Sequence, residues 1–152
     1  MVLKTIIFLF LNFAALALGS LFTSVEVKSE WYSLLNKAPW TPAGWVFGFA
    51  WTSIMICYAF YMSYLWTARQ DKEKLILLYS IQWVLNVAWN PIFFKFHYTN
   101  FALIVIVLLT LLIGYFLYRF LGDLRFKSLL IMPYFLWLLI ATSLNAYICL
   151  KN

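Results

Sequence analysis

The sequence predicts an all-α integral membrane protein, a bundle of five transmembrane helices with a long aromatic loop between the first two. Hydrophobic residues make up 66% of the 152-residue chain and charged residues only 11%, against roughly 45–50% and about 25% in soluble domains. A soluble core of this size would leave much of that apolar surface in water, so the bilayer must solvate it. The five acidic residues all lie in connections between apolar runs. Residues 1–152 are therefore expected to form one membrane domain.

Five apolar runs are each long enough, at about 20 residues, to cross the hydrocarbon core as a helix. Four of the runs carry no charged residue, and the other carries only Arg119 near its end. None shows the period-2 alternation of transmembrane strands, and lipid leaves no water for unpaired backbone groups. We therefore expect membrane-spanning helices over residues 5–23, 44–67, 75–94, 101–121 and 128–150.

The first run has a second interpretation. Lys4, the apolar stretch and the pattern Ala15-x-Ala17 resemble a signal peptide. Because the apolar run continues to Phe22, it is long enough to span the membrane, and we favour a transmembrane helix.

The distribution of basic residues predicts an orientation. The side shared by the N-terminus and the connections 68–74 and 119–127 carries Lys4, Arg69, Lys72, Lys74, Arg119, Arg125 and Lys127. The opposite side carries Lys28, Lys37, Lys95 and Lys151. Lysine and arginine favour the cytoplasmic side, so the N-terminus is expected inside and the C-terminus outside. Because no extension accompanies the apolar runs, we expect a bacterial cell membrane.

The longest connection, residues 24–43, is rich in tryptophan, tyrosine and proline. Loops of this length are usually lids or disordered linkers, and this one is too aromatic for a solvated linker. Ser29 is a suitable N-cap for a short helix over residues 29–37. Pro39 and Pro42 are then expected to hold the chain extended up to the second span.

Several function classes fit these residues poorly. The net charge of +6 comes from basic residues scattered through short loops, without the basic and aromatic surface that nucleic-acid binding requires. Cys57 and Cys149 lie inside apolar runs, where cysteine is usually a small buried hydrophobe, and His97 is the only histidine. No metal site is expected. Ordinary acid–base catalysis is also disfavoured, because no carboxylate, lysine or histidine lies within a span.

Unusual side chains gather in the half of the membrane beneath the long loop. At about 1.5 Å per residue, Trp51 lies about 10 Å below that surface and Trp137 about 20 Å, which is deep for the interfacial tryptophan belt. Asn86 and Asn145 are expected to face inward, because amides are costly against lipid. Such residues can simply mark the membrane surface and join helices. Their depth, beside the small Ala141, instead suggests a space for a flat apolar molecule.

Three blocks at matching intervals resemble the translocator protein family, also called tryptophan-rich sensory proteins or TspO/MBR. The first block, residues 31–51, reads W-Y-S-L-L-N-K-A-P-W-T-P-A-G-W-V-F-G-F-A-W. The second block, residues 82–94, reads Q-W-V-L-N-V-A-W-N-P-I-F-F. The third runs from Pro133 and Tyr134 through Trp137 and Ala141 to Leu144 and Asn145. The likeness covers nearly the whole chain.

The resemblance implies a five-helix bundle, often a homodimer, with an apolar pocket beneath the long loop. Family members bind porphyrins, and some bind sterols and synthetic aromatic ligands, so porphyrin is expected as a ligand and no cofactor is required. Together with the inward faces, the resemblance predicts these ligand-binding residues: Tyr32, Pro39, Trp40, Trp51, Asn86, Trp89, Phe93, Trp137, Ala141, Leu144 and Asn145.

The chain departs from the family pattern at several positions. Ala38 and Ala43 stand where the family usually has proline, so the loop is expected to be a less rigid roof. Phe101 replaces a tryptophan common in animal members, and Val105 replaces an acid often found there. These changes leave the identity of the ligand open.

Three functions are compatible with this sequence. The first is a membrane receptor, sensor or translocator that binds porphyrins and similar apolar planar ligands in a pocket under residues 24–43. An alternative, implied by the resemblance, is light- and oxygen-dependent porphyrin breakdown in which Trp51 and Trp137 take part. The third is a structural or partner protein, because Ala15-x-x-x-Gly19 forms a small-residue face suited to close helix packing.

Overall fold

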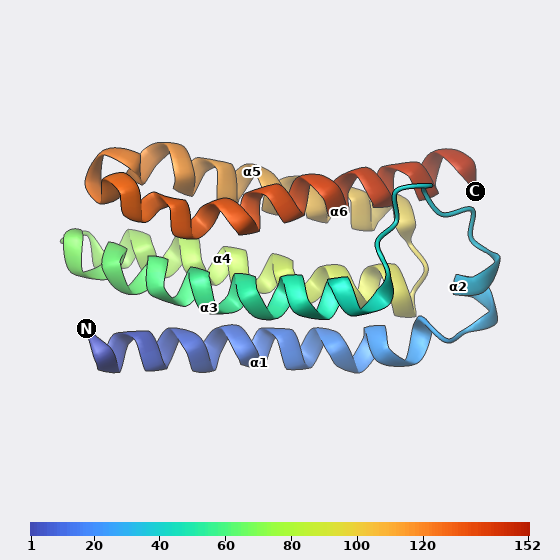
Figure 1. Ribbon diagram of the computed structural model, residues 1–152, viewed down its shortest axis with the longest axis horizontal. Helices are drawn as coiled ribbons and strands as arrows, with labels where there is room; N and C mark the ends of the chain where they lie inside the picture. Colours follow the sequence, from blue (N-terminus) through green and yellow to red (C-terminus); the bar gives the residue numbers. More distant parts are fainter.

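The computed structural model describes all residues, 1–152, and consists of helices and their connections. The long helices are α1 (Val2–Glu26), α3 (Gly44–Ala68), α4 (Lys72–Asn90), α5 (Thr99–Leu124) and α6 (Met132–Lys151). The short ones are α2 (Glu30–Leu34), the π-helix η1 (Pro91–Lys95) and the 3₁₀-helix η2 (Arg125–Ile131). The long helices run side by side along the longest axis, and α2 lies at one end of the bundle (Figure 1).

Four uninterrupted helical stretches are long and apolar enough to cross a membrane. They are Val2–Glu26, Gly44–Ala68, Lys72–Lys95 and Thr99–Lys151. The last is 53 residues long, and η2 folds it back so that α6 returns along α5 (Figure 1). The prediction of an all-helical membrane protein without strands is confirmed.

The predicted span 75–94 lies within the helical stretch Lys72–Lys95, but its last turn is not α-helical. Pro91 has no N–H to donate to the carbonyl one turn back, so the α-helical ladder cannot continue through it. The chain widens into the π-helix η1, in which the Phe96 N–H donates to the Pro91 carbonyl at 2.9 Å. The wider turn carries Phe93 and Phe94 into the buried end of the bundle.

The predicted span 128–150 is helical throughout, but it begins in a 3₁₀-helix rather than in α6. α5 ends where Arg125 takes a left-handed φ of 52°, which breaks the right-handed helix. Residues up to Ile131 form the 3₁₀-helix η2, and α6 begins at Met132. Pro133 therefore lies in the first turn of α6, where its missing N–H costs no hydrogen bond.

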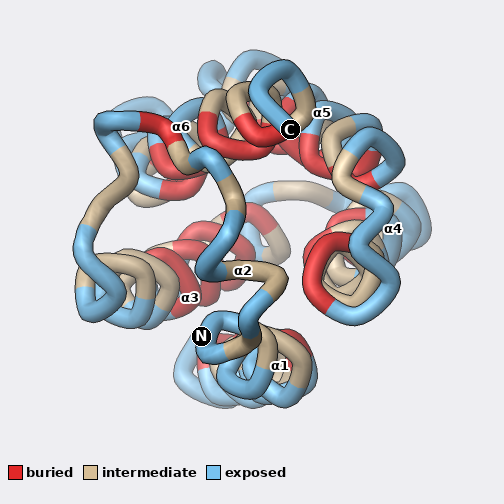
Figure 2. The backbone as a smooth tube through the Cα atoms, turned by 90° about the vertical axis from the view of Figure 1, so that its right-hand side faces the viewer, coloured by how far each residue is buried: buried red, intermediate tan, exposed pale blue.

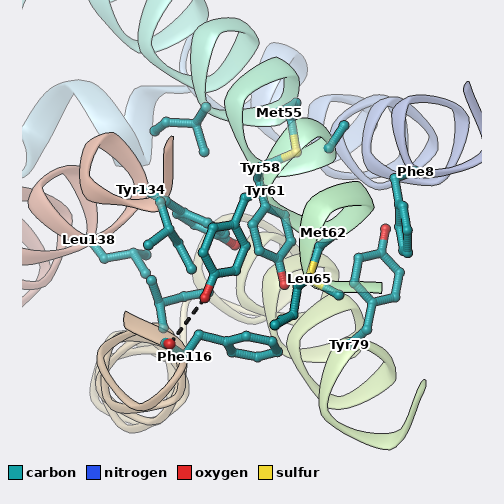
Figure 3. Close-up of a cluster of buried hydrophobic side chains, with 14 of the residues drawn as sticks. Phe8, Met55, Tyr58, Tyr61, Met62, Leu65, Tyr79, Phe116, Tyr134 and Leu138 are labelled. Atoms are coloured by element: carbon teal, nitrogen blue, oxygen red, sulfur yellow. Dashed lines mark hydrogen bonds between the residues drawn. The ribbon is translucent and has the colours of Figure 1, made fainter. Parts of the chain in front are cut away.

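The five long helices turn their buried faces toward a common core (Figure 2). α1 contacts α3 and α4, while α5 contacts α4 and α6. Aromatic rings fill the centre, where Tyr58 packs edge-to-face against Tyr134 with ring centroids 5.3 Å apart. The Tyr61 hydroxyl donates to the Phe116 carbonyl at 3.0 Å (Figure 3). The core thus joins α3 to α5 and α6.

Buried polar side chains cross-link the helices. The Asn12 amide donates to the Met55 carbonyl at 3.0 Å and accepts from the Tyr79 hydroxyl at 2.6 Å, which joins α1 to α3 and α4. The Thr5 hydroxyl donates to the Ser63 hydroxyl at 2.9 Å. In lipid an unpaired amide or hydroxyl would cost free energy, so these bonds set the register of the helices.

The small-residue face of α1 packs within the bundle. Ala15 and Gly19 are both buried, and a Cβ added at Gly19 would lie 2.6 Å from Nδ2 of Asn90. The Asn90 side chain cannot move away freely, because it donates to the Asn86 carbonyl and accepts from the Thr23 hydroxyl at 2.9 Å. The close approach of α1 to α4 therefore requires glycine.

We expect Gly19→Ala to lower the free energy of unfolding by about 1–3 kcal/mol, because it breaks the hydrogen bonds of the Asn90 amide. Gly48→Ala is the matched control, since nothing lies within 4 Å of a Cβ there. That control should be neutral or stabilising, because alanine is the better helix former. Thermal unfolding in detergent measures both variants, and equal stabilities would contradict the packing argument.

Candidate ligand-binding site

The helix α2 covers one end of the bundle. Ser29 caps it as predicted, since its side-chain oxygen accepts from the Tyr32 N–H at 3.2 Å. The helix is shorter than the predicted 29–37, because the chain becomes extended at Leu35. The Asn36 N–H then donates to the side chain of Asn152 at 2.9 Å rather than to a helical carbonyl. The loop is thus directed toward the end of α6.

Aromatic contacts hold α2 against the π-helix η1. The Trp31 ring stacks on His97 with centroids 3.8 Å apart and meets Phe93 edge-to-face at 5.8 Å. The Tyr32 ring lies 5.9 Å from that of Phe94. His97 has a left-handed φ of 57°, which places its ring under Trp31. Because η1 exists only where Pro91 widens the helix, this docking follows from the proline.

Residues 35–43 are attached to α6 by the contacts of Asn36 and Trp40, which we call the clasp. The Asn36 side chain donates to the Lys151 carbonyl at 3.2 Å, and the Asn152 amide donates back to the Asn36 carbonyl at 3.3 Å. The Trp40 indole donates to the Ser143 hydroxyl at 3.1 Å, and its ring packs edge-to-face on Tyr147 at 5.4 Å. All these groups lie at the surface of the bundle end, so the clasp can be opened without disturbing the core.

Together, α2 and residues 35–43 form a roof over this end of the bundle. A small cavity of about 60 Å³ lies beneath it. Among the predicted ligand-binding residues, its wall contains Tyr32, Trp89, Phe93, Ala141, Leu144 and Asn145. It also contains residues outside that predicted set: Lys37, Thr41, Phe47, Phe94 and Ile148. The helical period offered a signal for two of them, because Phe47 lies one turn before Trp51 and Ile148 one turn after Leu144.

The other predicted residues lie outside the cavity wall. Pro39 and Trp40 are exposed on the roof, and Asn86 is buried one turn below Trp89. Trp51 packs against Tyr134 in the α3–α6 interface, with ring centroids 5.9 Å apart. The structure therefore separates the predicted set into the cavity wall, its roof and a deeper layer that includes Trp137.

Asn145 joins three helices at the cavity wall. Its side-chain oxygen accepts from the Trp89 indole at 3.1 Å, and its Nδ2 donates to the Thr99 carbonyl at 2.9 Å. The prediction that this amide faces inward is confirmed, since Asn145 is buried. Its hydrogen bonds are already made within the protein, so it sets the shape of the cavity and the position of the Trp89 ring.

Trp137 is a buried donor without an acceptor. The residue is 7% exposed, and its indole N–H makes no hydrogen bond. Its ring meets Phe47 edge-to-face at 5.4 Å, and Phe47 also lines the cavity. A buried unpaired N–H costs about 1–3 kcal/mol. Phe47 therefore contacts Trp137 and also forms part of the cavity wall.

One cationic group lines the cavity. The ammonium of Lys37 lies 4.4 Å from the centroid of the Tyr32 ring, a cation–π contact at the mouth. The Tyr32 hydroxyl is protonated at neutral pH and can donate a hydrogen bond, and burial raises its pKa further above the ordinary value. The Lys37 ammonium and the Tyr32 hydroxyl are therefore two hydrogen-bond donors that could bind a carboxylate.

The chain was compared with known protein families, and one family matches it. The family model described as TspO/MBR matches residues 7–150, nearly the whole chain. The chain belongs to the TspO/MBR family. Its four long apolar helical stretches make this member an integral membrane protein.

Several named proteins are similar to this chain over most of its length. A tryptophan-rich sensory protein of Cereibacter sphaeroides is 31% identical over 139 residues, which is 90% of this chain and 87% of that protein. The TspO protein of Chlorobaculum tepidum is 31% identical over 88% of this chain and 86% of its own length. The human translocator protein is 29% identical over 76% of this chain and 71% of its own length.

We expect Asn36→Ala to loosen the roof while leaving the fold intact, because it removes the side-chain bond to α6. Amide hydrogen exchange over residues 35–43 should accelerate several-fold, as expected for a loss of about 1 kcal/mol of local stability. Asn100→Ala is a matched control at an exposed position of α5. Equal exchange in the two variants would show that the clasp does not hold the loop.

We expect Asn145→Leu to destabilise the protein by about 1–3 kcal/mol, because the Trp89 indole N–H loses its acceptor and the Thr99 carbonyl loses its bond to α6. Asn86→Leu tests whether any buried amide in this half has the same effect. The melting temperature in detergent should fall further for Asn145→Leu. A smaller fall than for Asn86→Leu would contradict the role assigned to Asn145.

Proposed function

We propose that this protein is a membrane receptor, sensor or translocator that binds a porphyrin or a similar flat apolar molecule beneath residues 24–43. The observation that carries the proposal is the unpaired indole N–H of Trp137, buried beside an aromatic cavity. Flat ligands are usually held by aromatic faces with a few placed polar groups, and this arrangement offers both. Membership of a family with members named sensory and translocator proteins supports the same proposal.

The cavity must enlarge to admit such a ligand. Its volume of about 60 Å³ is below the roughly 300–1,000 Å³ of typical ligand pockets. Two movements supply the space: release of the clasp at Asn36 and Trp40, and rotation of Phe47 away from Trp137. Rotation of Phe47 joins the cavity to the α3–α6 interface, where Trp51 lies next to Tyr134. The predicted deep tryptophans then come into contact with the ligand.

The polar mouth suits the acidic side chains of a tetrapyrrole. Lys37 lines the cavity, and the Tyr32 hydroxyl remains a donor at neutral pH. An ammonium–carboxylate hydrogen bond is stronger than a neutral one, so Lys37 would favour acidic over neutral planar ligands.

The proposal includes the topology and assembly of the chain. We propose that Thr99–Lys151 crosses the membrane twice, which makes five crossings with the N-terminus inside and the C-terminus outside a bacterial cell membrane. The basic residues on the side of the N-terminus support that orientation. A homodimer would use a surface other than the Ala15 and Gly19 face, because α4 already covers that face.

We expect Ala141→Leu to weaken porphyrin binding at least tenfold, because three added carbons would fill the cavity that the ligand must enter. Ala17→Leu adds the same group at an exposed position of α1 and should bind normally. Quenching of tryptophan fluorescence by protoporphyrin in detergent measures both affinities. If a folded Ala141→Leu variant binds as tightly as the control, the assignment of the site fails.

The same titration under illumination tests the alternative function, porphyrin breakdown. Conversion of the bound porphyrin to a new pigment would support it, and Trp51→Phe should then stop the conversion.

A further inference from the structure

A much larger opening lies at the other end of the bundle. An apolar groove of about 610 Å³ runs between α1, α3 and α4. Figure 1 shows the end of the bundle at which α1 starts, α3 ends and α4 starts. This groove is separate from the cavity beneath α2, and the two share no lining residue. Its walls include Phe8, Trp66, Tyr79 and Trp83.

The groove has the dimensions and the openness of a site for a lipid chain. It extends from Lys4 to Leu11 along α1 and from Leu75 to Val84 along α4, which is about 10–14 Å at 1.5 Å per residue. Its outer edges are open to the bilayer, since Ile76 is 52% exposed and Val84 is 57% exposed. An acyl chain can therefore enter sideways from the membrane.

The side chains at the base of the groove are held in place. The Trp83 indole donates to the Leu11 carbonyl at 2.9 Å, and the Tyr79 hydroxyl donates to Asn12 at 2.6 Å. Their polar atoms are used between α1 and α4, so their apolar ring surfaces remain for a guest molecule. The groove is thus a preformed feature of the bundle.

Positive charge marks one end of the groove. Lys4 lines it and makes no ion pair with a carboxylate. The Lys72 ammonium donates to the carbonyls of Trp66 and Arg69 at the same end, which holds a second cation beside the Trp66 ring. Two acids flank Lys72 in the sequence: Asp71 caps α4 by accepting from the Lys74 N–H, and Glu73 forms no ion pair with a lysine.

We propose that this groove binds an anionic phospholipid, with its phosphate at Lys4 and an acyl chain along the α1–α4 wall. Lys4 lies at the end of α1 that reaches the membrane surface, so a headgroup can meet the ammonium while the chain stays in the hydrocarbon. A zwitterionic lipid gains less, because its own ammonium offsets the phosphate. A second copy of the chain would place its own lysine at this end and bring no counter-charge to Lys4, whereas the phosphate of an anionic lipid brings one.

Bromolipid quenching of tryptophan fluorescence tests the proposal in the full chain. The protein is placed in phosphatidylcholine vesicles that contain increasing fractions of dibrominated phosphatidylglycerol or dibrominated phosphatidylcholine. Subtracting the signal of Trp83→Phe isolates the tryptophan at the base of the groove. We expect phosphatidylglycerol to quench this contribution with about fivefold higher apparent affinity, as for one lysine near a membrane surface.

Matched variants separate a specific site from general surface charge. Lys4→Gln should remove the preference for phosphatidylglycerol, and Lys4→Arg should keep it. Lys127→Gln, which removes one charge at the same end of the bundle but outside the groove, should also keep it. Ser80→Phe, at an exposed position that lines the groove, should reduce quenching by both lipids.

Three results would overturn the proposal. One is equal affinity of the two bromolipids for the wild-type protein. Another is loss of the preference in Lys127→Gln to the same degree as in Lys4→Gln. The third is efficient disulfide formation between copies of a Ser80→Cys variant that lacks the two natural cysteines, which would show that a second protein chain fills the groove. None of these results depends on porphyrin binding at the other end.

Discussion

The lack of water in the bilayer core is the constraint on which the rest of this structure depends. A polar group on an inner face costs free energy unless it bonds to another part of the chain, because lipid offers no partner. Asn12 illustrates the result, since its one amide joins the backbone of α3 to a tyrosine of α4. Asn145 does the same for α4, α5 and α6 at the opposite end. These bonds position the helices whose apolar surfaces alone would slide past one another.

The sequence was most informative where a single physical rule acts along the chain. Charge-free runs located the helical stretches, and the cost of amides in lipid predicted that Asn86 and Asn145 face inward. The N-cap at Ser29 followed from local chemistry. Each of these inferences needs only the residues of one element.

The remaining features depend on contacts between distant parts of the chain. Pro91 is visible in the sequence, but its effect is a π-helix whose rings receive Trp31 and Tyr32 from a separate loop. The pairing of Asn36 with Asn152 links residues 116 positions apart. The groove between α1 and α4 left no motif, because its walls consist of ordinary apolar residues and one lysine. The size of the loop-side cavity also depends on side-chain packing, which Phe47 decides.

The two ends of the bundle present different routes of access. The cavity beneath α2 is closed by surface hydrogen bonds at the end of the bundle, so its ligand would arrive from the headgroup region or from water. The groove beside α1 opens sideways and needs no movement of the backbone. The two proposed sites would therefore be reached independently, one from the lipid and the other from the membrane surface.

The clasp between the loop and α6 also has a consequence for biosynthesis. The ribosome completes residues 30–40 long before it makes Ser143, Tyr147 and Asn152, which hold them. The rings of α2 can dock on η1 before α6 is made, but the bonds of Asn36 and Trp40 cannot form until α6 is in place. The loop over residues 35–43 is therefore fixed only after the last helix of the chain has been synthesised.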